Sequence, residues 1–287
     1  MKTYLENASY DWSEDSIRFI YTANQFIKKT LFYIQEAGYF KTTDSYYTER
    51  ENLDSFLIVY TLSGSGLLEM DDTTYPIEPH QLFFIPCMKH HYYCCRKDKE
   101  WEFLWIHFNG IAARGYYEKY STSQTPVITI DPQAGIPEQM RQVLSLIQKK
   151  ELNRDYMISN ILTNILTQLI LTQSQGDESP FLPDYLIQTI KYIDQHFKEE
   201  ISLDQLSKEI GISKFYLLKQ FKKYFETTIR EYQIVTRLNY AKELLKYTDT
   251  PVHDISDACG INQTSHFIHL FKKHECLTPL QYRNKWK

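Results

Sequence analysis

Two spacings of hydrophobic residues divide this chain into a front part and a rear part. Between about residues 30 and 108, apolar residues alternate with polar ones or form short runs bounded by turn residues, as in 56–62 followed by Gly64 and Gly66. This two-residue period predicts short antiparallel strands. Many such strands at close spacing are typical of a small β-sandwich or barrel.

From about Pro137 the hydrophobic period lengthens to that of an α-helix. Two apolar stripes follow at i, i+3, i+4, i+7 spacing. They consist of Met140, Val143, Leu144 and Ile147, and of Ile158, Ile161, Leu162, Ile165, Leu166, Leu169 and Ile170. Residues 174–184 are polar and contain glycine and proline, so we interpret them as a linker. The remainder, residues 185–287, is helical in pattern.

A motif occurs twice in this rear part, with a period of 50 residues between the Phe-Lys-Lys triplets that begin at Phe221 and Phe271. Each copy has an apolar helical pattern, a glycine followed by Ile, and a second helical pattern that ends in the triplet. The glycines, Gly211 and Gly260, allow the positive φ that ends a helix. Two helices joined by such a turn form a helix-turn-helix, so the pair predicts sequence-specific DNA binding.

Residues that begin helices mark the four helices of the two copies. Ser202, with Gln205 three positions later, forms a capping box, and Ser213 precedes the next helix. In the second copy we expect Thr250 and Asn262 to cap the corresponding helices. Between the copies, residues 229–245 carry one apolar stripe, which predicts a single long helix that holds the two units rigidly.

The second helix of each copy supplies the candidate DNA contacts, because its outward positions carry basic, hydroxyl or imidazole groups. These positions are Lys214, Phe215, Leu218, Lys219, Lys222 and Lys223, then Thr264, Ser265, His266, His269, Lys272 and Lys273. Charge supports this division of the chain. Residues from Asp184 onward carry 16 Lys and Arg against 13 Asp and Glu, whereas the preceding residues carry 16 against 23. A basic part tethered to an acidic part is compatible with nucleic-acid binding by the basic part alone.

Four short motifs in the rear part resemble the AraC/XylS family of transcriptional regulators. They are Arg237-x-x-x-Ala241-x-x-x-Leu245, Ala258-x-Gly260-Ile261, Phe271-Lys-Lys273 and Thr278-Pro279-x-x-Tyr282-Arg283. The resemblance implies that Phe215, Leu218 and Lys219, then Thr264, Ser265, His266 and His269, read bases, while nearby lysines and helix N-termini hold phosphates. The glycine that the family usually has after each recognition helix is Glu226 in one copy and Cys276 in the other.

The front part resembles the cupin-like effector domain of the same family. Gly64-x-Gly66, the Pro79-His80-Gln81 turn and Pro86-x-x-x-His90-His91-Tyr92 carry this resemblance. The expected fold is therefore α+β with two domains. Residues 1–136 would form an antiparallel cupin-like β-barrel or jelly roll, residues 137–173 a helical dimerisation segment, and residues 185–287 an all-α double helix-turn-helix. For the stripe at 158–170, packing against its own barrel is the alternative to the subunit seam, which we favour.

The strand 101–108 carries the candidate effector site. Its alternation places Trp101, Phe103, Trp105 and His107 on one face. The resemblance implies that an aromatic ring on this strand stacks on a sugar inside the barrel, with Trp105 first by position. Tyr92 and His91 would supply a polar rim and Arg50 a charged contact. The alternative is that these aromatic residues are core packing.

A metal or a cofactor is not expected. His80, His90, His91 and His107 do not follow the spacing of a metal-binding cupin, and adjacent His90 and His91 point to opposite faces of a strand. Catalytic residues are not expected either, since paired carboxylates on the barrel strands are missing. An enzyme that modifies sugars on a cupin fold is the rival interpretation, with a helical accessory domain.

The sequence therefore predicts a DNA-binding transcriptional regulator, not an enzyme, controlled by a small effector such as a sugar or oligosaccharide. A non-sugar effector such as a fatty acid, or a ligand-free architectural DNA binder, are the alternatives. Expected partners are double-stranded DNA, the effector and a second copy of the chain, with RNA polymerase as a further candidate. Five cysteines without a C-x-x-C pair, and the lack of a long apolar run or an apolar N-terminal leader, favour the cytoplasm and no membrane association.

Overall fold

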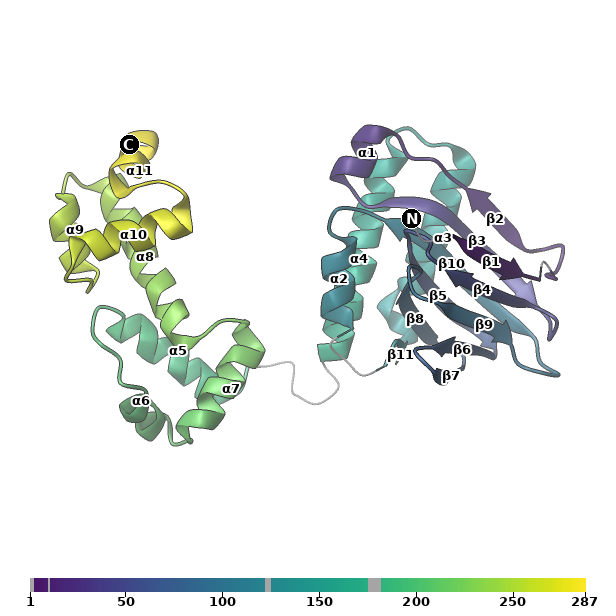
Figure 1. The fold of residues 1–287 in the computed structure, drawn as a ribbon, viewed down its shortest axis with the longest axis horizontal. Helices are drawn as coiled ribbons and strands as arrows, with labels where there is room; N and C mark the ends of the chain where they lie inside the picture. Colours follow the sequence, from purple (N-terminus) through teal and green to yellow (C-terminus); the bar gives the residue numbers. More distant parts are fainter. Residues whose placement is uncertain (1–2, 10, 122–124, 175–181) are drawn as a thin grey trace. The chain divides into compact units, whose positions relative to one another are not determined.

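The computed structural model describes residues 3–9, 11–121, 125–174 and 182–287, and the chain divides into two units, residues 1–178 and 179–287 (Figure 1). The first unit contains strands and helices, and the second contains helices only among its described residues. This confirms the predicted α+β, two-domain class. Most of the predicted linker, residues 175–181, lies outside the described residues.

Two antiparallel sheets build the first unit. The five-stranded sheet has the order β1-β4-β9-β6-β7 and the six-stranded sheet the order β11-β8-β5-β10-β3-β2. The strands of the first are β1 (Leu5–Ala8), β4 (Tyr47–Glu51), β9 (His91–Cys95), β6 (Gly66–Met70) and β7 (Thr73–Ile77). Those of the second are β11 (Val127–Thr129), β8 (Gln81–Pro86), β5 (Phe56–Gly64), β10 (Trp101–Asn109), β3 (Tyr33–Thr42) and β2 (Ile17–Ile20).

The two sheets form an open sandwich and not the closed barrel that was one of the expected forms. Within the described residues, no strand of one sheet pairs with a strand of the other. Side chains fill the space between the facing sheets, as in a jelly roll, so strand hydrogen bonds need not close around it.

Strand β10 shows how the layers are arranged, because its alternate residues enter two different cores. Phe103 and Trp105 lie in the core between the two sheets. Leu104 and Ile106 lie on the opposite face, in the core between the six-stranded sheet and the helices. The alternation predicted for this strand is therefore confirmed.

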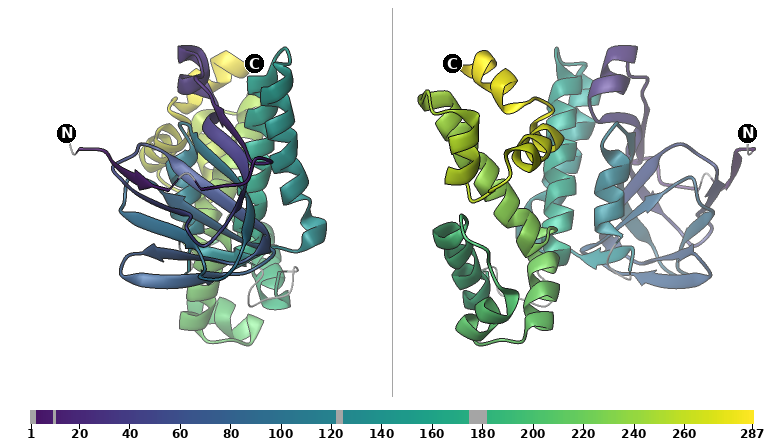
Figure 2. Two further views of the ribbon diagram at one scale, coloured as in Figure 1. Left: turned by 90° about the vertical axis from the view of Figure 1, so that its right-hand side faces the viewer. Right: turned by 60° about the vertical axis from the view of Figure 1, so that its left-hand side comes forward.

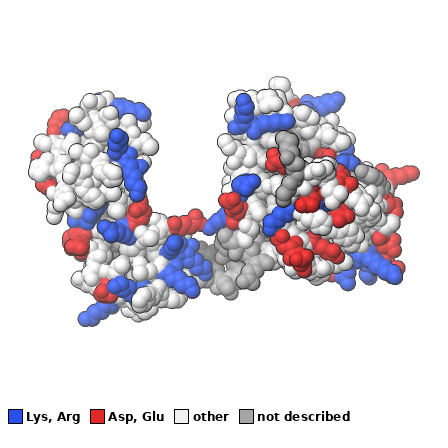
Figure 3. Space-filling model, viewed as in Figure 1, with Lys and Arg blue, Asp and Glu red and all other residues white. Residues whose placement is uncertain are grey.

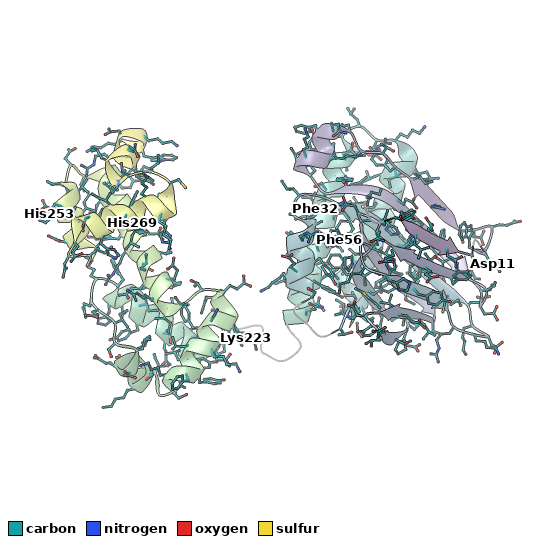
Figure 4. The ribbon with its side chains drawn as sticks, in the orientation of Figure 1. Asp11, Phe32, Phe56, Lys223, His253 and His269 are labelled. Atoms are coloured by element: carbon teal, nitrogen blue, oxygen red, sulfur yellow. The ribbon has the colours of Figure 1, made fainter. Side chains whose placement is uncertain are left out.

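Helices cover the outer face of the six-stranded sheet (Figures 1 and 2). They are α2 (Ala113–Tyr120), α3 (Ile136–Lys149) and α4 (Arg154–Ser174), whereas α1 (Gln25–Thr30) precedes β3 and the 3₁₀ turn Pro132–Ala134 precedes α3. Phe32 and Phe56, labelled in Figure 4, contribute to the core beneath these helices.

The apolar stripe of α4 packs inside its own unit. Ile158, Leu162 and Ile165 are at most 2% exposed and belong to the core beneath the six-stranded sheet. The preference for a seam between subunits along this stripe was therefore wrong, because these side chains are already covered within one chain. The outward face of α4 instead exposes Tyr156, Met157 and Leu171.

Seven helices, α5 to α11, form the described part of the second unit. They are α5 (Asp184–His196), α6 (Leu203–Ile210), α7 (Lys214–Phe225), α8 (Ile229–Tyr247), α9 (Val252–Ala258), α10 (Thr264–Glu275) and α11 (Pro279–Trp286). The 19-residue α8 confirms the predicted long helix. It contributes Ile229 to the core of the first helix-turn-helix and Leu238, Ala241 and Leu245 to the core of the second.

Helix starts agree with the predicted caps in the first copy and differ in the second. The side chains of Ser202 and Ser213 accept hydrogen bonds from the backbone N–H groups at the starts of α6 and α7. In the second copy, the capping residues are Pro251 and Gln263, and neither makes a side-chain cap. Thr250 and Asn262 were therefore wrongly predicted as caps.

Candidate functional site

Helix α7 presents a basic and aromatic face to solvent. Phe215 is 84% exposed, and Lys219, Lys222 and Lys223 are exposed beside it. These positions recur every three or four residues, so they lie along one side of the helix. Leu217 and Phe221 point to the other side and are buried in the first helix-turn-helix core.

The other two candidates on α7 have partners within the protein. Lys214 forms an ion pair with Asp204 of α6, with an Nζ–Oδ1 distance of 2.9 Å. Leu218 is half-buried against the core that contains Leu217. The structure therefore separates an outward set of α7 residues from two candidates that also stabilise the packing of α6 and α7.

Helix α10 presents the matching face in the second copy. Ser265, His266 and His269 are exposed, as are Lys272 and Lys273 in the last turns. Thr264 is less available for contacts outside the protein, because its hydroxyl lies 2.9 Å from the Nδ1 atom of His253 on α9. Figure 4 labels His253, His269 and Lys223, which mark the second copy and the end of α7.

The two faces correspond residue by residue at the 50-residue period. Phe215 corresponds to Ser265, Lys219 to His269, and Lys222 to Lys272. Tyr216, 47% exposed, was missed as a candidate, although the same period pairs it with His266. Lys and Arg atoms lie over both halves of this unit (Figure 3), and α7 itself contains no Asp or Glu.

The loop between α5 and α6 is hydrogen-bonded to the central helix α8. Nε of Arg237 donates to the carbonyl oxygen of Phe197 at 2.5 Å, and its Nη2 donates to that of Glu199 at 2.7 Å. Gln233, one turn earlier on α8, donates to the same two carbonyls. These charge-assisted bonds cap the end of α5 and fix it against α8. Helix α8, which contributes to the cores of both copies, is thus also bonded to the loop after α5.

A cavity of about 20 Å³ lies between the sheets of the first unit, with room for about one water molecule. Its walls come from the N-terminal segment, from β2, β3 and β4, and from the facing strands. The lining residues are Glu6, Ala8, Ser9, Trp12, Arg18, Phe40, Tyr46, Thr48, Arg50, Tyr93 and Trp105. A neighbouring pocket of about 180 Å³ shares Arg50 and contains Glu36, Ser55 and His107 among its lining residues.

The position of Trp105 depends on a glycine in the adjacent strand. Gly38 pairs with Trp105 across β3 and β10, and a Cβ built on Gly38 would lie 2.8 Å from the indole ring. The absence of a side chain lets the ring approach the backbone and face the cavity. Gly38 is thus a sequence signal for the position of the Trp105 ring, and hydrophobic spacing alone does not reveal it.

Arg50 is at the centre of a buried polar chain. Its Nη2 donates to Oε1 of Glu6 at 3.0 Å, and its Nη1 donates to Nε2 of His107 at 2.6 Å. Since a guanidinium can only donate, Nε2 of His107 accepts and Nδ1 carries the proton. That Nδ1–H then donates to the hydroxyl of Ser55, 3.1 Å away.

Burial, hydrogen bonds and the charge of Arg50 together set the protonation states of His107 and Glu6. Burial, reinforced by the charge of Arg50, holds the pKa of His107 well below its usual range, so this imidazole is neutral. Burial opposes ionisation of Glu6, but the hydrogen bond from Tyr4 and the charge of Arg50 outweigh it and lower the pKa of Glu6. Glu6 and Arg50 therefore form a true ion pair at neutral pH.

Three buried nitrogen atoms around Arg50 lack a hydrogen-bond partner within the described part of the chain. They are Nε of Arg50, Nε1 of Trp105 and Nε2 of His91. His91 lies opposite Arg50 in the β4–β9 pair, and its Nδ1 donates to the carbonyl of Lys89. Because buried polar groups are nearly always paired, this set is typical of a binding site.

Apart from Tyr92, the predicted effector residues fall into four groups. Trp105 and Arg50 line the cavity, His107 lines the neighbouring pocket, and His91 lies beside Arg50. Trp101 and Phe103 are at most 1% exposed in the core between the sheets and line neither space, so they are packing residues.

Tyr92 is on the opposite face of its strand, and its expected place at the rim was wrong. Its ring stacks on Tyr47 on the outer side of the five-stranded sheet, with centroids 6.0 Å apart. The next residue, Tyr93, lines the cavity instead. Adjacent strand residues point to opposite faces, so an error of one position reverses the side chain. The sequence analysis also missed other polar and aromatic residues of the cavity wall, among them Glu6, Trp12, Arg18 and Tyr46.

The described residues contain neither a metal-binding cluster nor a membrane-spanning helix. Among them, no group of three or more His, Cys, Asp or Glu side chains lies close enough together to hold a metal ion. Within the same residues, no helix is both long enough and apolar enough to cross a membrane.

Comparison with known proteins identifies both units. Residues 33–182 match the family described as AraC-like ligand binding domain, and residues 206–285 match the family described as helix-turn-helix domain. The first of these matches covers more than half of the 287 residues.

Curated relatives extend over most of the chain. The MmsAB operon regulatory protein of Pseudomonas aeruginosa is 22% identical over 88% of this chain and 83% of its own length. The Msm operon regulatory protein of Streptococcus mutans is 21% identical over 81% and 85%. The lactose operon transcription activator of Staphylococcus xylosus is 23% identical over 77% and 81%.

Among solved structures, the C-terminal domain of the response regulator yesN from Fusobacterium nucleatum is similar in part. It is 29% identical, covers 35% of this chain and 99% of its own, and has a TM-score of 0.34. The two family matches and the curated relatives agree on one assignment. The chain belongs to the AraC family of transcriptional regulators, with an AraC-like ligand-binding domain followed by a helix-turn-helix DNA-binding domain.

Proposed function

We propose that this regulator is controlled by a sugar or short oligosaccharide that binds between the two sheets of the first unit. The observation that carries the proposal is the convergence of Trp105, Arg50 and His91 on one buried region. The indole of Trp105 offers an apolar face, and its N–H is unpartnered among the described residues. An aromatic face surrounded by hydrogen-bonding groups suits a ring that carries hydroxyls. The lactose operon activator among the relatives also supports a sugar.

On the DNA side, the outward faces of α7 and α10 enter successive major grooves. The proposed contacts are Lys214, Phe215, Leu218, Lys219, Lys222 and Lys223 in the first copy and Thr264, Ser265, His266, His269, Lys272 and Lys273 in the second. The lysine-rich α7 supplies more of the phosphate contacts, and the apolar Phe215 suits a thymine methyl group. The neutral groups of α10 supply weaker base discrimination.

The active form is a dimer that works in the cytoplasm, where DNA is accessible, and RNA polymerase is a further partner. The subunits meet through the outward face of α4, with Tyr156, Met157 and Leu171, because its inward stripe is already buried. Control by the effector requires that the effector bind two arrangements of the dimer with different affinity.

Calorimetric titration of the full-length protein with mono- and oligosaccharides tests the effector. We expect one sugar to bind, and Trp105→Phe to weaken its binding because the ring remains while the indole N–H is lost. Trp101→Phe is the control, since the N–H of Trp101 bonds to Thr61 in the core and not to a ligand. Equal loss in both variants, or no sugar bound, contradicts the sugar proposal.

Selection of bound sequences from a random DNA pool tests the DNA proposal. We expect two short conserved blocks about one helical turn apart, one for each recognition helix. A single block would remove one helix from the proposed interface. Recovery of unenriched DNA would remove both.

A further inference from the structure

The side chain of Arg50 is only 10% exposed, and its charge is neutralised from the N-terminal segment. The carboxylate of Glu6, on β1, is 3.0 Å from its Nη2. Glu6 is the only carboxylate that forms an ion pair with Arg50 among the described residues. The other arginine of the cavity, Arg18, pairs with Glu36 on β3.

The cavity has no room for an effector while the N-terminal segment is in place. Its volume is about 20 Å³, and Glu6, Ala8, Ser9 and Trp12 form part of its wall. A larger ligand that enters this cavity therefore needs part of its wall to move, and the N-terminal segment is the part of the wall that lies at a sheet edge. Glu6 belongs to β1, an edge strand of four residues that pairs only with β4 among the described strands. Such a strand is held by few backbone contacts and can be displaced.

Displacement of Glu6 changes the electrostatics of the site. The other groups in direct contact with Arg50 or opposite it are neutral imidazoles, because Nε2 of His107 accepts its hydrogen bond and Nε2 of His91 has no partner within the described residues. Glu36, which lines the neighbouring pocket with Arg50, is already paired with Arg18. The guanidinium would then be a buried charge without a counterion, which is strongly unfavourable. A neutral sugar cannot compensate for this charge, whereas an anion can.

We propose that the effector carries a carboxylate that replaces the carboxylate of Glu6 on Arg50 and releases β1 from β4. In the free protein, Glu6 acts as an internal competitor. The Nη2 group that now binds Glu6 and the unpartnered Nε–H together offer a bidentate site for a carboxylate. This inference rests on the proposed effector cavity and specifies the chemistry of its ligand.

Matched acid and neutral pairs test the proposal by calorimetric titration of the full-length protein. The pairs are galacturonate and galactose, benzoate and benzyl alcohol, and octanoate and octanol, which distinguish a sugar acid from an aromatic or aliphatic acid. We expect one acid to bind at least tenfold more tightly than its neutral partner. Equal or tighter binding of every neutral partner, or no acid bound by either the wild type or Glu6→Gln, overturns the proposal.

Glu6→Gln provides the decisive variant. It removes the competing carboxylate, so binding of the acid should tighten by about tenfold or more. The size of the gain depends on the fraction of free protein molecules in which Glu6 is bound to Arg50. Glu49→Gln is the control, because Glu49 lies on the paired strand and contacts His90 and Asn7 but not Arg50, and a glutamine can still accept from Asn7. Weaker acid binding in Glu6→Gln, or the same tightening in Glu49→Gln, contradicts the competition.

Amide hydrogen exchange gives an independent readout of the released strand. Protection of residues 5–8 should fall when the acid binds and should be low in Glu6→Gln without ligand. Unchanged protection on saturation with the acid overturns the release of β1. Binding of galactose without binding of galacturonate would refute this inference while leaving the proposed sugar control intact, so the two failures are distinguishable.

Discussion

The backbone of Gly260 lies directly against the carbonyl oxygen of Lys198. A Cβ at Gly260 would be 1.8 Å from that oxygen, and the φ of Gly260 is +74°. This contact joins the turn of the second helix-turn-helix to the loop that follows α5. Gly211, the equivalent residue of the first copy, has a φ of +79°, but no atom of the described residues lies within 4 Å of its Cβ position.

The two glycines therefore differ in how they tolerate alanine. Gly211→Ala should lower the free energy of unfolding of the helical unit by about 1 kcal/mol, which is the cost of a side chain at positive φ. Gly260→Ala should cost about 3 kcal/mol or more, since the new methyl also collides with a backbone carbonyl. Urea unfolding of both variants measures the difference in unfolding free energy, and hydrogen exchange of the α8 amides gives a second measurement. Similar costs would show that Lys198 moves away easily.

Cys276 takes a left-handed conformation at the end of α10, where glycine is the favoured residue. Its φ is +58°, and its side chain is exposed. Cys276→Gly should raise the melting temperature by a few degrees, equivalent to about 1 kcal/mol. Cys276→Ala keeps the Cβ and serves as the control, with little expected change. A gain of the same size in both variants would assign the effect to loss of the thiol instead.

Lys219 is central on the exposed face of α7. Lys219→Ala should weaken binding to the selected operator, and the slope of log affinity against log salt should fall by about 1 if the side chain contacts a phosphate. Lys191→Ala, an exposed lysine on α5 outside the recognition helices, should change neither quantity. Fluorescence anisotropy at several salt concentrations measures both. An unchanged affinity would place Lys219 outside the interface.

Acid should destabilise the first unit through its buried histidines. Burial, with a smaller contribution from the charge of Arg50, lowers the pKa of His91 to about 4 from the 6.5 of an exposed imidazole. As pH falls below about 6.5, His91 binds a proton in the unfolded state but not in the folded state. Stability is therefore lost between about pH 6.5 and 4, amounting to about 2 kcal/mol at pH 5. Burial of His107 acts in the same direction.

His91→Asn isolates the contribution of His91 to this pH dependence. An asparagine amide can still donate to the carbonyl of Lys89 but does not titrate. The loss of unfolding free energy between pH 7 and 5 should therefore be smaller in His91→Asn than in the wild type. His90→Asn changes the exposed neighbour of His91 and serves as the control. Identical pH profiles for all three proteins would exclude His91 as a cause.

The helical unit was predictable in detail because its signals are local. The glycine turns, the serine caps of the first copy and the stripe of α8 each depend on residues within one or two helical turns. The 50-residue period also placed the outward residues of α7 and α10 on equivalent faces. The predicted caps of the second copy failed, because the chain there begins its helices after Pro251 and Gln263, which lack a capping side chain.

The candidate ligand site was predictable only in part, because its strands are far apart in the sequence. The faces of β10 followed from its alternation, and Arg50 and Trp105 were correctly expected to share a cavity. In β9, aromatic and polar residues occur on both faces, so the pattern did not show whether Tyr92 or Tyr93 points inward. The role of Glu6 depends on the pairing of β1 with β4, for which the sequence contains no local signal.

The sequence by itself determined the two-domain class, the tandem helix-turn-helix and the family, since these depend on short-range spacing and on motifs of a few residues. Only the tertiary structure decided that the sheets form an open sandwich, that the α4 stripe is covered within one chain, and that Glu6 neutralises Arg50. The physical reason is that strand pairing and burial depend on contacts between segments far apart in the sequence, such as β1 with β4 and β3 with β10. A hydrophobic pattern states that a face must be covered, but not which partner covers it.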